Sequence, residues 1–312
     1  MPAASVIVPA RDAEATLART LTCLDRQEGA PDFQVIVVDD GSRDRTLELA
    51  RAAGVTALTQ ERLGAAEARN RGVAEARGEA LAFLDADCFP EPGWLAAGLH
   101  ALEAADIVQG RVTPDPAAEL GPFDRTLWIT EHIGLWQTAS LFVTRAAFDR
   151  IGGFEDWLDV AGGKLMAEDV WFGWRAQRSG ARAAFAPEAL AHHAVFARGP
   201  GAYTAERGRA RYFPEIAARM PELRRSMFYR QLFLSRRTAA FDLAGAGLAV
   251  AALTRSALPL AAALPYLRLS WRERLRLAGA RAPLVGTVDA AADAVTLVAL
   301  LRGSARARTA VL

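Results

Sequence analysis

The chain has 312 residues, of which 52% are hydrophobic and 23% charged, a composition that excludes a disordered chain and is typical of a globular protein. The formal net charge is +1, so a nucleic acid partner is not expected. The charge is nevertheless uneven. Residues 1–200 carry 19 basic and 29 acidic side chains, a net charge of −10, whereas residues 201–312 carry 18 and 7, a net charge of +11. This asymmetry is typical of a chain whose basic part contacts a membrane or polyanion.

Cysteine usage and the N-terminus indicate the compartment. Cys23 and Cys88 lie far apart in the sequence, in segments predicted as helix and loop, so no disulfide framework is predicted. A reducing cytosol is therefore expected. The N-terminal residues enter a strand pattern at once, without the basic start and long apolar run of a secretory signal. No such signal is expected.

Short apolar runs alternate with amphipathic stretches through the first half of the chain. Strands are predicted at 5–9, 33–40, 55–59 and 79–87, with helices at 13–27, 44–53 and 65–77 between them. Runs that are apolar on both faces, such as Val35–Val38, suit strands covered by helices on each side. The pattern therefore predicts an α/β fold with a doubly wound, mostly parallel sheet, whose ligands collect at the carboxyl ends of the strands.

The pattern changes twice further along the chain. Residues 1–113 are predicted to form a nucleotide-binding half and the looser segment 114–200 an acceptor-facing half, which together make a catalytic domain over 1–200. Residues 201–312 are Arg-rich and helical, with apolar stretches at 238–267 and 282–301. This second region is predicted to associate with a membrane.

Neither apolar stretch is expected to span a bilayer, because charged residues interrupt both. Asp242 and Arg255 fall in the first stretch, and Asp289 and Asp293 in the second. Basic clusters at 236–237, 268–281 and 302–308 flank the stretches on every side, and interfacial or re-entrant helices keep all three clusters cytoplasmic. The alternative is a soluble helical cap or a dimer surface.

A pair of carboxylates follows the fourth predicted strand. Asp85 and Asp87 stand two residues apart after an apolar run, and hard oxygen ligands at this spacing suit Mg²⁺ or Mn²⁺. Cys88 is adjacent, but hard cations prefer oxygen, so this thiol is interpreted as packing. Taken alone, the pair is equally compatible with a solvated turn, in which Asp is common.

A second carboxylate pair strengthens the case for a site at this edge. Asp39 and Asp40 end the second predicted strand, where an Asp can accept a hydrogen bond from a nucleobase imide or a ribose hydroxyl. Ser42 is expected to cap the helix that follows. Of Arg69 and Arg71 on the third predicted helix, one is positioned to reach a diphosphate while the other stays a solvated charge.

Six segments in order resemble the successive motifs of family 2 glycosyltransferases with the GT-A fold. The resemblance covers about residues 4–195. Near Arg11 and Asp12 the chain departs from it, because many relatives have Tyr-Asn or Arg-Asn there. The segments are VIVPARDAEATLARTL, VIVVDDGSRD, GAAEARNRG, FLDAD, IGGFED and AEDVWFGWRAQRSG.

The resemblance implies roles for individual residues. Asp39 would contact the nucleobase and Asp40 would support the nucleoside pocket, while Asp85 and Asp87 would hold a Mn²⁺ or Mg²⁺ ion. His193 is in the position where similar enzymes place a histidine near the metal or diphosphate, and the adjacent His192 is the alternative. The full set of nucleotide-sugar contacts implied is Pro9, Asp12, Asp39, Asp40, Arg69, Asp85, Ala86 and Gln137.

Asp169, with Glu168 beside it, is the implied catalytic base. Inverting sugar transfer needs one carboxylate to take the acceptor hydroxyl proton while the leaving diphosphate is neutralised. Acids in the first turn of a helix also complement its dipole, and both roles are compatible. Trp136 and Gln137, with Gly152–Phe154, are predicted to shape the donor-sugar and acceptor pocket, although Trp136 is equally compatible with the core.

These features predict an inverting, metal-dependent glycosyltransferase. Its donor would be a nucleoside-diphosphate sugar, its acceptor lipid-linked or saccharide, and its pathway cell-surface polysaccharide or glycolipid synthesis. The basic, apolar region 201–312 predicts a location on the cytoplasmic side of the membrane, with a soluble cytoplasmic enzyme as the alternative. Two other functions are weighed: a non-catalytic nucleotide-binding membrane scaffold, and a sugar nucleotidyltransferase, whose Gly-rich triphosphate loop is absent from the N-terminal segment.

Overall fold

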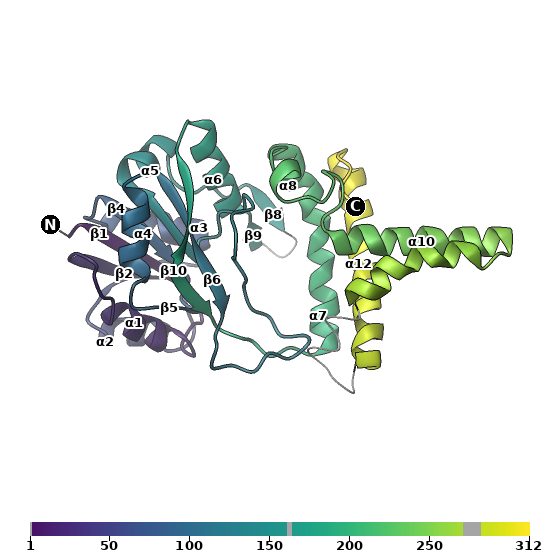
Figure 1. The fold of residues 1–312 in the computed structure, drawn as a ribbon. Helices are drawn as coiled ribbons and strands as arrows, with labels where there is room; N and C mark the ends of the chain where they lie inside the picture. The colour runs from purple at the N-terminus through teal and green to yellow at the C-terminus, as the bar shows by residue number, and fades with distance from the viewer. Residues whose placement is uncertain (1, 161–163, 271–281) are drawn as a thin grey trace. The chain divides into compact units, whose positions relative to one another are not determined.

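The computed structural model describes residues 2–160, 164–270 and 282–312. The chain divides into two compact units (Figure 1). The first comprises residues 1–118 and 126–195, and the second comprises 119–125 and 196–312. The division lies near the expected boundary at residue 200, but the loop 119–125 belongs with the C-terminal unit. Of the basic cluster expected at 268–281, the part after residue 270 lies outside the described residues.

An eight-stranded sheet forms the centre of the first unit, in the order β3-β2-β1-β4-β7-β6-β10-β5. The first four of these strands run parallel, as do β6 and β10, whereas β7 is antiparallel to both neighbours and β5 to β10. This mostly parallel sheet confirms the predicted α/β class. Its strands are β1 (Ala4–Ala10), β2 (Phe33–Asp39), β3 (Thr56–Thr59), β4 (Ala80–Leu84), β5 (Cys88–Pro90), β6 (Ile107–Pro114), β7 (Ser140–Thr144) and β10 (Ala183–His193).

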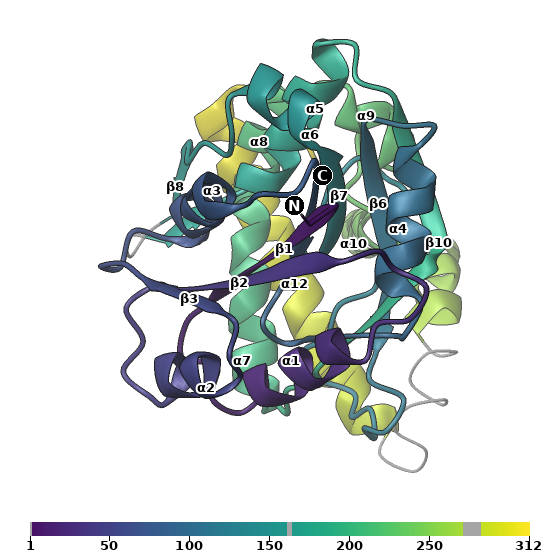
Figure 2. The same cartoon turned by 90° about the vertical axis from the view of Figure 1, so that its left-hand side faces the viewer.

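Helices cover both faces of this sheet. Figure 2 shows α1 and α2 on one side of β1–β3 and α3 on the other. Val37 packs in the same cluster as Leu17 and Leu21 of α1, while its neighbours Ile36 and Val38 pack with Ala68 of α3. Successive strand residues point to opposite faces, which is why the run is apolar throughout. The helices are α1 (Leu17–Asp25), α2 (Thr46–Ala52), α3 (Ala65–Glu75), α4 (Trp94–Leu102), α5 (Arg145–Ile151) and α6 (Glu168–Arg178).

The carboxyl ends of the parallel strands carry the predicted acidic residues. Asp39 is the last residue of β2 and is in register with Ala10 of β1, and Asp85 directly follows β4. A two-stranded antiparallel sheet of β8 (Leu158–Val160) and β9 (Lys164–Met166) leads into α6. The start of α6 supplies the remaining acidic pair of the site.

The second unit is helical. Its long elements are α10 and α12, and Figure 1 shows α10 extending away from α12, with η2 and the helical residues 264–270 returning along it. The first predicted apolar stretch therefore forms a helical hairpin and the second a single helix. The elements are α7 (Pro200–Glu206), η1 (Arg207–Tyr212), α8 (Phe213–Arg219), α9 (Leu223–Ser226), α10 (Arg236–Thr254), η2 (Leu258–Ala263) and α12 (Ala282–Ala307).

Buried ion pairs account for the acidic residues within α12. Arg237 Nη2 lies 2.9 Å from Asp293 Oδ2 and 3.4 Å from Asp289 Oδ2. Tyr203 donates a hydrogen bond to Asp289 Oδ1 at 3.0 Å, and Tyr266 donates to Asp293 Oδ2 at 2.6 Å. Among the described helices, α12 is the one long and apolar enough to cross a membrane, which by itself is weak evidence for a span.

Candidate active site

Arg69 joins two of the predicted acidic positions. Its helix α3 lies directly on β1 at Gly72, where a Cβ atom would be 2.5 Å from the Cγ2 atom of Ile7. The Arg69 side chain is buried, and its Nη2 donates to Asp85 Oδ1 at 3.1 Å while its Nη1 donates to Glu168 Oε1 at 2.9 Å. The end of β4 and the start of α6 are thus connected through one guanidinium group.

Asp169 is the most strongly perturbed acid of this group. Its Oδ1 accepts a hydrogen bond from the Val170 backbone N–H at 2.7 Å. Burial and, to a lesser extent, the charge of Glu168 raise the pKa of Asp169 to about 8, against the opposing charge of Arg69. A carboxyl group whose pKa lies near physiological pH can both hold and release a proton there, which is the property required of a general base.

Asp87 and His193 meet on the other side of the same edge. Cys88, the first residue of β5, pairs with His193 of β10, and the His193 Nε2 atom lies 3.5 Å from Asp87 Oδ2. His193 Nδ1 lies 2.6 Å from the Ala194 carbonyl oxygen. A carbonyl only accepts, so Nδ1 carries the hydrogen and the lone pair of Nε2 faces the carboxylate unless the ring is doubly protonated. A cation or a proton between these two groups removes their repulsion.

The adjacent histidine has partners elsewhere. His192 Nε2 lies 2.7 Å from Glu91 Oε1, and its Nδ1 lies 2.9 Å from Thr113 Oγ1. Consecutive residues of a strand point to opposite faces, which separates His192 from the neighbour of Asp87. Of the two histidines weighed from the sequence, the structure places His193 beside the predicted metal motif.

The donor set suits an open cation site. Within the described residues, no group of three or more His, Cys, Asp or Glu side chains is arranged to hold a metal ion. Asp85 is engaged by Arg69, so Asp87 and His193 are the nearest pair of ligands. Burial, together with Asp85 and Asp87, raises the pKa of the Cys88 thiol, which therefore remains protonated. One or two protein ligands with positions left for phosphate oxygens match the preference of Mg²⁺.

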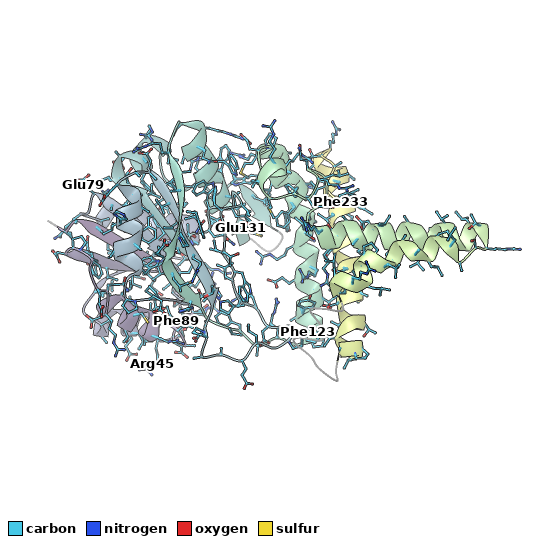
Figure 3. All side chains as sticks on the ribbon, viewed as in Figure 1. Arg45, Glu79, Phe89, Phe123, Glu131 and Phe233 are labelled. Atoms are coloured by element: carbon cyan, nitrogen blue, oxygen red, sulfur yellow. The ribbon has the colours of Figure 1, made fainter. Side chains whose placement is uncertain are left out.

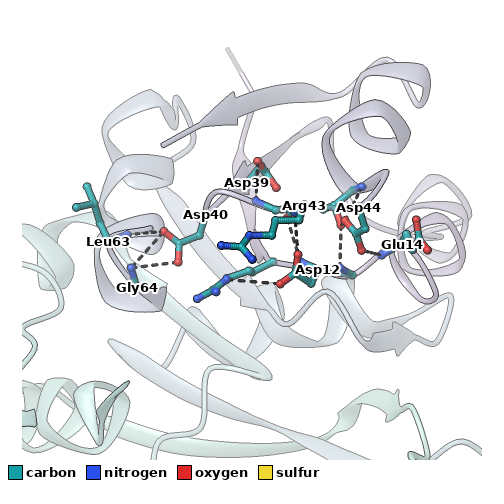
Figure 4. A network of polar contacts seen from close by, with 12 residues as sticks. Asp12, Glu14, Asp39, Asp40, Arg43, Asp44, Leu63 and Gly64 are labelled. Carbon is teal, nitrogen blue, oxygen red and sulfur yellow. Dashed lines mark hydrogen bonds and ion pairs between the residues drawn. The ribbon is translucent and has the colours of Figure 1, made fainter. Parts of the chain in front are cut away.

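Asp39 presents a buried acceptor atom at the end of β2. Its Oδ2 accepts from the Ser42 backbone N–H at 3.4 Å (Figure 4). Thr59 Oγ1 donates to the same oxygen at 3.5 Å. Its Oδ1 is buried and has no hydrogen-bond partner among the described residues. An unpaired buried carboxylate oxygen is costly, so this atom is suited to accept a hydrogen bond from a ligand.

Asp40 is fully occupied by the protein itself. Its Oδ1 accepts from Leu63 N–H at 2.8 Å, and the Gly64 N–H lies 3.1 Å from its Oδ2 (Figure 4). Gln60 Nε2 also donates to Oδ1 at 2.8 Å. These bonds fix the loop that leads into α3. Asp40 therefore positions the helix that carries Arg69.

The loop after β2 corrects one prediction. Ser42 does not cap α2: its Oγ accepts from the Asp12 N–H at 2.9 Å, whereas the Thr46 N–H donates to Asp44 Oδ1 at 3.0 Å. Asp12 Oδ1 accepts in turn from the Arg43 N–H at 2.9 Å, as Figure 4 shows. Asp12 and Ser42 thus tie the loops after β1 and β2 together, so the Asp at this position has a structural partner.

Trp136 belongs to the hydrophobic core of the first unit. It is completely buried against α6, where a Cβ atom on Gly173 would lie 1.9 Å from its Cγ atom. Gln137 is half-buried, and its carbonyl accepts from Gln109 Nε2 at 3.0 Å. The core alternative for Trp136 is therefore the position observed.

Gly173→Ala is predicted to lower the free energy of unfolding by about 1–3 kcal/mol, because the added methyl group displaces the Trp136 indole. Urea unfolding monitored by tryptophan fluorescence measures the change. Gly93→Ala is the control, since nothing lies within 4 Å of a Cβ atom there. Equal stability of the two variants would contradict the packing role.

Comparison with known proteins supplies the family. The model of glycosyl transferase family 2 matches residues 5–154. Glycosyltransferase AglE of Haloferax volcanii is 30% identical over 210 residues, which are 62% of this chain and 67% of AglE. The chain belongs to glycosyltransferase family 2. A pre-mycofactocin glycosyltransferase of Mycobacterium tuberculosis is 28% identical over 209 residues, and this chain covers only 42% of its length.

Solved structures show that this glycosyltransferase has the GT-A fold. The mannosyltransferase PcManGT of Pyrobaculum calidifontis, in complex with GDP-Man and Mn²⁺, aligns with a TM-score of 0.57 at 21% identity, over 97% of this chain and 87% of the other. Residues 1–349 of TarS of Staphylococcus aureus, in complex with UDP-GlcNAc, align with a TM-score of 0.51 at 17% identity, over 99% and 93% of the two chains.

Two further predicted donor contacts, Pro9 and Ala86, are placed in the structure by their backbone. Pro9 is half-buried on β1, in register with Val38 of β2. The Ala86 carbonyl, between the two carboxylates of the metal motif, accepts from Thr20 Oγ1 at 2.9 Å. This hydrogen bond fixes the backbone of the metal motif to α1.

Asn70 is a site residue that the sequence analysis missed. Its Nδ2 donates to the Phe154 carbonyl at 2.9 Å, and its Oδ1 accepts from the Phe154 N–H at 2.8 Å. These two bonds fasten the Gly152–Gly153 turn of the glycosyltransferase to α3, next to Arg69. The only sequence signal was its position beside that arginine.

Proposed function

We propose that this glycosyltransferase is inverting and metal-dependent, and transfers a sugar from a nucleoside-diphosphate sugar to an acceptor hydroxyl. The observation that carries the proposal is the half-buried Asp169, whose pKa is raised to about 8 at the edge where Asp85 and Asp87 follow β4. A base beside a cation motif meets the two requirements of displacement at the anomeric carbon: removal of the acceptor proton and neutralisation of the departing diphosphate.

Asp169 takes the proton from the acceptor hydroxyl in this proposal. Arg69 holds Glu168 and Asp85 in place, and its charge lowers the pKa of Asp169, so the base is ionised more readily than burial alone permits. Asp39 Oδ1 accepts a hydrogen bond from the nucleobase or ribose of the donor. Arg69 contributes to donor binding mainly through the acids that it orients.

A divalent cation, Mn²⁺ or Mg²⁺, would be held by Asp87 and His193, with Asp85 beside them. When bound, it supplies positive charge that stabilises the leaving diphosphate. Support comes from His193 Nε2, which lies 3.5 Å from Asp87 Oδ2, and from the presence of Mn²⁺ with GDP-Man in PcManGT.

The acceptor and the location are also proposals. Residues 201–312 have a net charge of +11, and leucines of the second unit are exposed. Both features support a location at the cytoplasmic surface of a membrane. Such a location suits a lipid-linked or saccharide acceptor in cell-surface polysaccharide or glycolipid synthesis.

A screen of nucleotide sugars tests the reaction. Release of nucleoside diphosphate is expected with Mn²⁺ or Mg²⁺ and is expected to stop when a chelator removes the metal. Asp87→Asn should lower turnover at limiting metal by about 10–100-fold, since it removes a ligand charge. Asp25→Asn, at an exposed position on α1, is the control. Turnover that is equal with and without chelator would contradict metal dependence.

Three related measurements separate this reaction from the alternatives. A non-catalytic scaffold binds nucleoside diphosphate by calorimetry but releases none from any sugar donor. Formation of inorganic pyrophosphate from a nucleoside triphosphate and a sugar phosphate would indicate a nucleotidyltransferase. Inversion is read from the anomeric configuration of the product, since a single displacement reverses it.

A further inference from the structure

The hairpin formed by α10, η2 and helical residues 264–270, hereafter the C-terminal hairpin, has small residues on its inside. Ala240, Ala244 and Gly247 are the buried residues of α10. A Cβ atom on Gly247 would lie 2.6 Å from the Pro259 carbonyl oxygen, so the two arms are in backbone contact at this point. Small residues that allow such close approach are typical of helices that pack together within lipid.

Large apolar side chains lie on the outside of the same hairpin. Leu253 is 85% exposed and Leu258 83%, on either side of the turn, and Leu243, Leu248 and Leu267 are also exposed. Figure 3 shows side chains projecting from both outer sides of α10 and its returning arm. A water-soluble hairpin has the opposite arrangement, with leucines inside and polar groups outside.

The exposed leucines of α10 surround the helix and do not form a single stripe. Leu243, Leu248 and Leu253 are each five residues apart, and five residues rotate an α-helix by about 140°, so the three side chains point in three different directions. A protein partner covers one face of a helix. Lipid acyl chains contact all of its faces.

Charge is almost absent from the exposed part of the hairpin. Between residues 243 and 267 the sequence contains one charged side chain, Arg255 at the turn, whereas Arg236, Arg237 and Arg268 stand at the opposite end. These arginines can interact electrostatically with anionic lipid headgroups. The 12 residues of α10 from Leu243 to Thr254 extend about 18 Å, which is enough to enter the roughly 30 Å hydrocarbon core of a bilayer without crossing it.

We propose that the C-terminal hairpin inserts its apolar portion, residues 243–267, into the hydrocarbon region of an anionic phospholipid bilayer. Its basic end remains at the headgroups. This inference rests on the proposed membrane location but not on glycosyl transfer. It assigns the insertion to the hairpin and not to α12, whose Asp289 and Asp293 are engaged by Arg237 within the unit.

Flotation with vesicles of phosphatidylcholine and phosphatidylglycerol tests the proposal. Full-length protein is expected to float in about 1 M salt, where the Debye length is about 3 Å and adsorption through basic clusters alone is screened. The double variant Leu253→Glu and Leu258→Glu should reduce the floated fraction about tenfold or more, because it places two carboxylates in the hydrocarbon. Leu63→Glu, at a 53% exposed leucine of the first unit, should float like the wild type.

Three further measurements make the outcome decisive. Circular dichroism and donor hydrolysis should be unchanged in the double variant, since both leucines are exposed and outside the site. An environment-sensitive dye on Leu253→Cys, in a Cys23→Ser background, should brighten on addition of vesicles. Flotation that is lost in high salt, equal flotation of the double variant, or lipid-free dimers dispersed by the double variant would each overturn the proposal. None of these results depends on turnover, so a failure here is distinct from a failure of the proposed reaction.

Discussion

Asp169→Asn is expected to lower kcat for sugar transfer by about 10²–10⁴-fold, because the acceptor hydroxyl loses its proton acceptor. The amide is close in size to the carboxyl, so binding of the donor should persist. Single-turnover measurement of nucleoside diphosphate release, with calorimetry for donor affinity, separates the two effects. Asp156→Asn is the control, an exposed acid near the same helix. Full turnover in Asp169→Asn would show that another group acts as the base.

The pH dependence gives an independent test of the same residue. Since the pKa of Asp169 is raised to about 8, kcat/KM should rise with pH and level off above about 8. Stability should change in the opposite direction. A raised pKa stabilises the folded protein while the carboxyl is protonated, and this contribution is lost as pH rises through about 8. Thermal unfolding should therefore show that Asp169→Asn gains stability over the wild type as pH increases from about 4 to about 8.

Arg69→Met is expected to lower the free energy of unfolding by about 3–5 kcal/mol. The substitution keeps much of the side-chain volume but leaves Asp85 and Glu168 without their shared counter-charge. Urea unfolding measures the loss. Activity should fall as well, because removal of the guanidinium also removes the charge that lowers the pKa of Asp169.

Arg71→Met is the matched control for this prediction. Arg71 lies on the same helix but is exposed, so its replacement should change stability by no more than about 0.5 kcal/mol. In the double variant Arg69→Met, Glu168→Gln, part of the loss should be recovered, since one unpaired carboxylate is then neutral. Similar stability of the Arg69 and Arg71 variants would show that the two ion pairs contribute little.

Much of the site could be predicted because parallel strands bring their carboxyl ends together. Asp39 and Asp85 stand at the carboxyl ends of two parallel apolar strands, so their common edge follows from the alternation of strands and helices. The Arg69 contact with Glu168 joins residues 99 positions apart, and no local pattern encodes it. Ser42 failed as a predicted cap for a similar reason, since its hydroxyl is taken by Asp12, 30 residues away.

In the second unit, composition indicated the elements but not their partners. Asp289 and Asp293, spaced one helical turn apart, lie within one continuous apolar helix. Their neutralisation by Arg237 depends on how α10 and α12 pack, which the sequence does not specify. For the same reason the sequence could not show that the leucines of α10 face outward while Ala240 and Ala244 face inward.

The position of β10 in the sheet has a consequence for synthesis of the protein. This strand lies between β6 and β5 and brings His193 beside Cys88, yet it is made last among the strands of the unit. A nascent chain that has reached residue 154, where the family match ends, contains the segment predicted to bind the nucleotide but neither Asp169 nor His193. Until β10 is inserted, the edges of β6 and β5 are unpaired templates for aggregation, so expression of a shortened domain requires residues through at least 193.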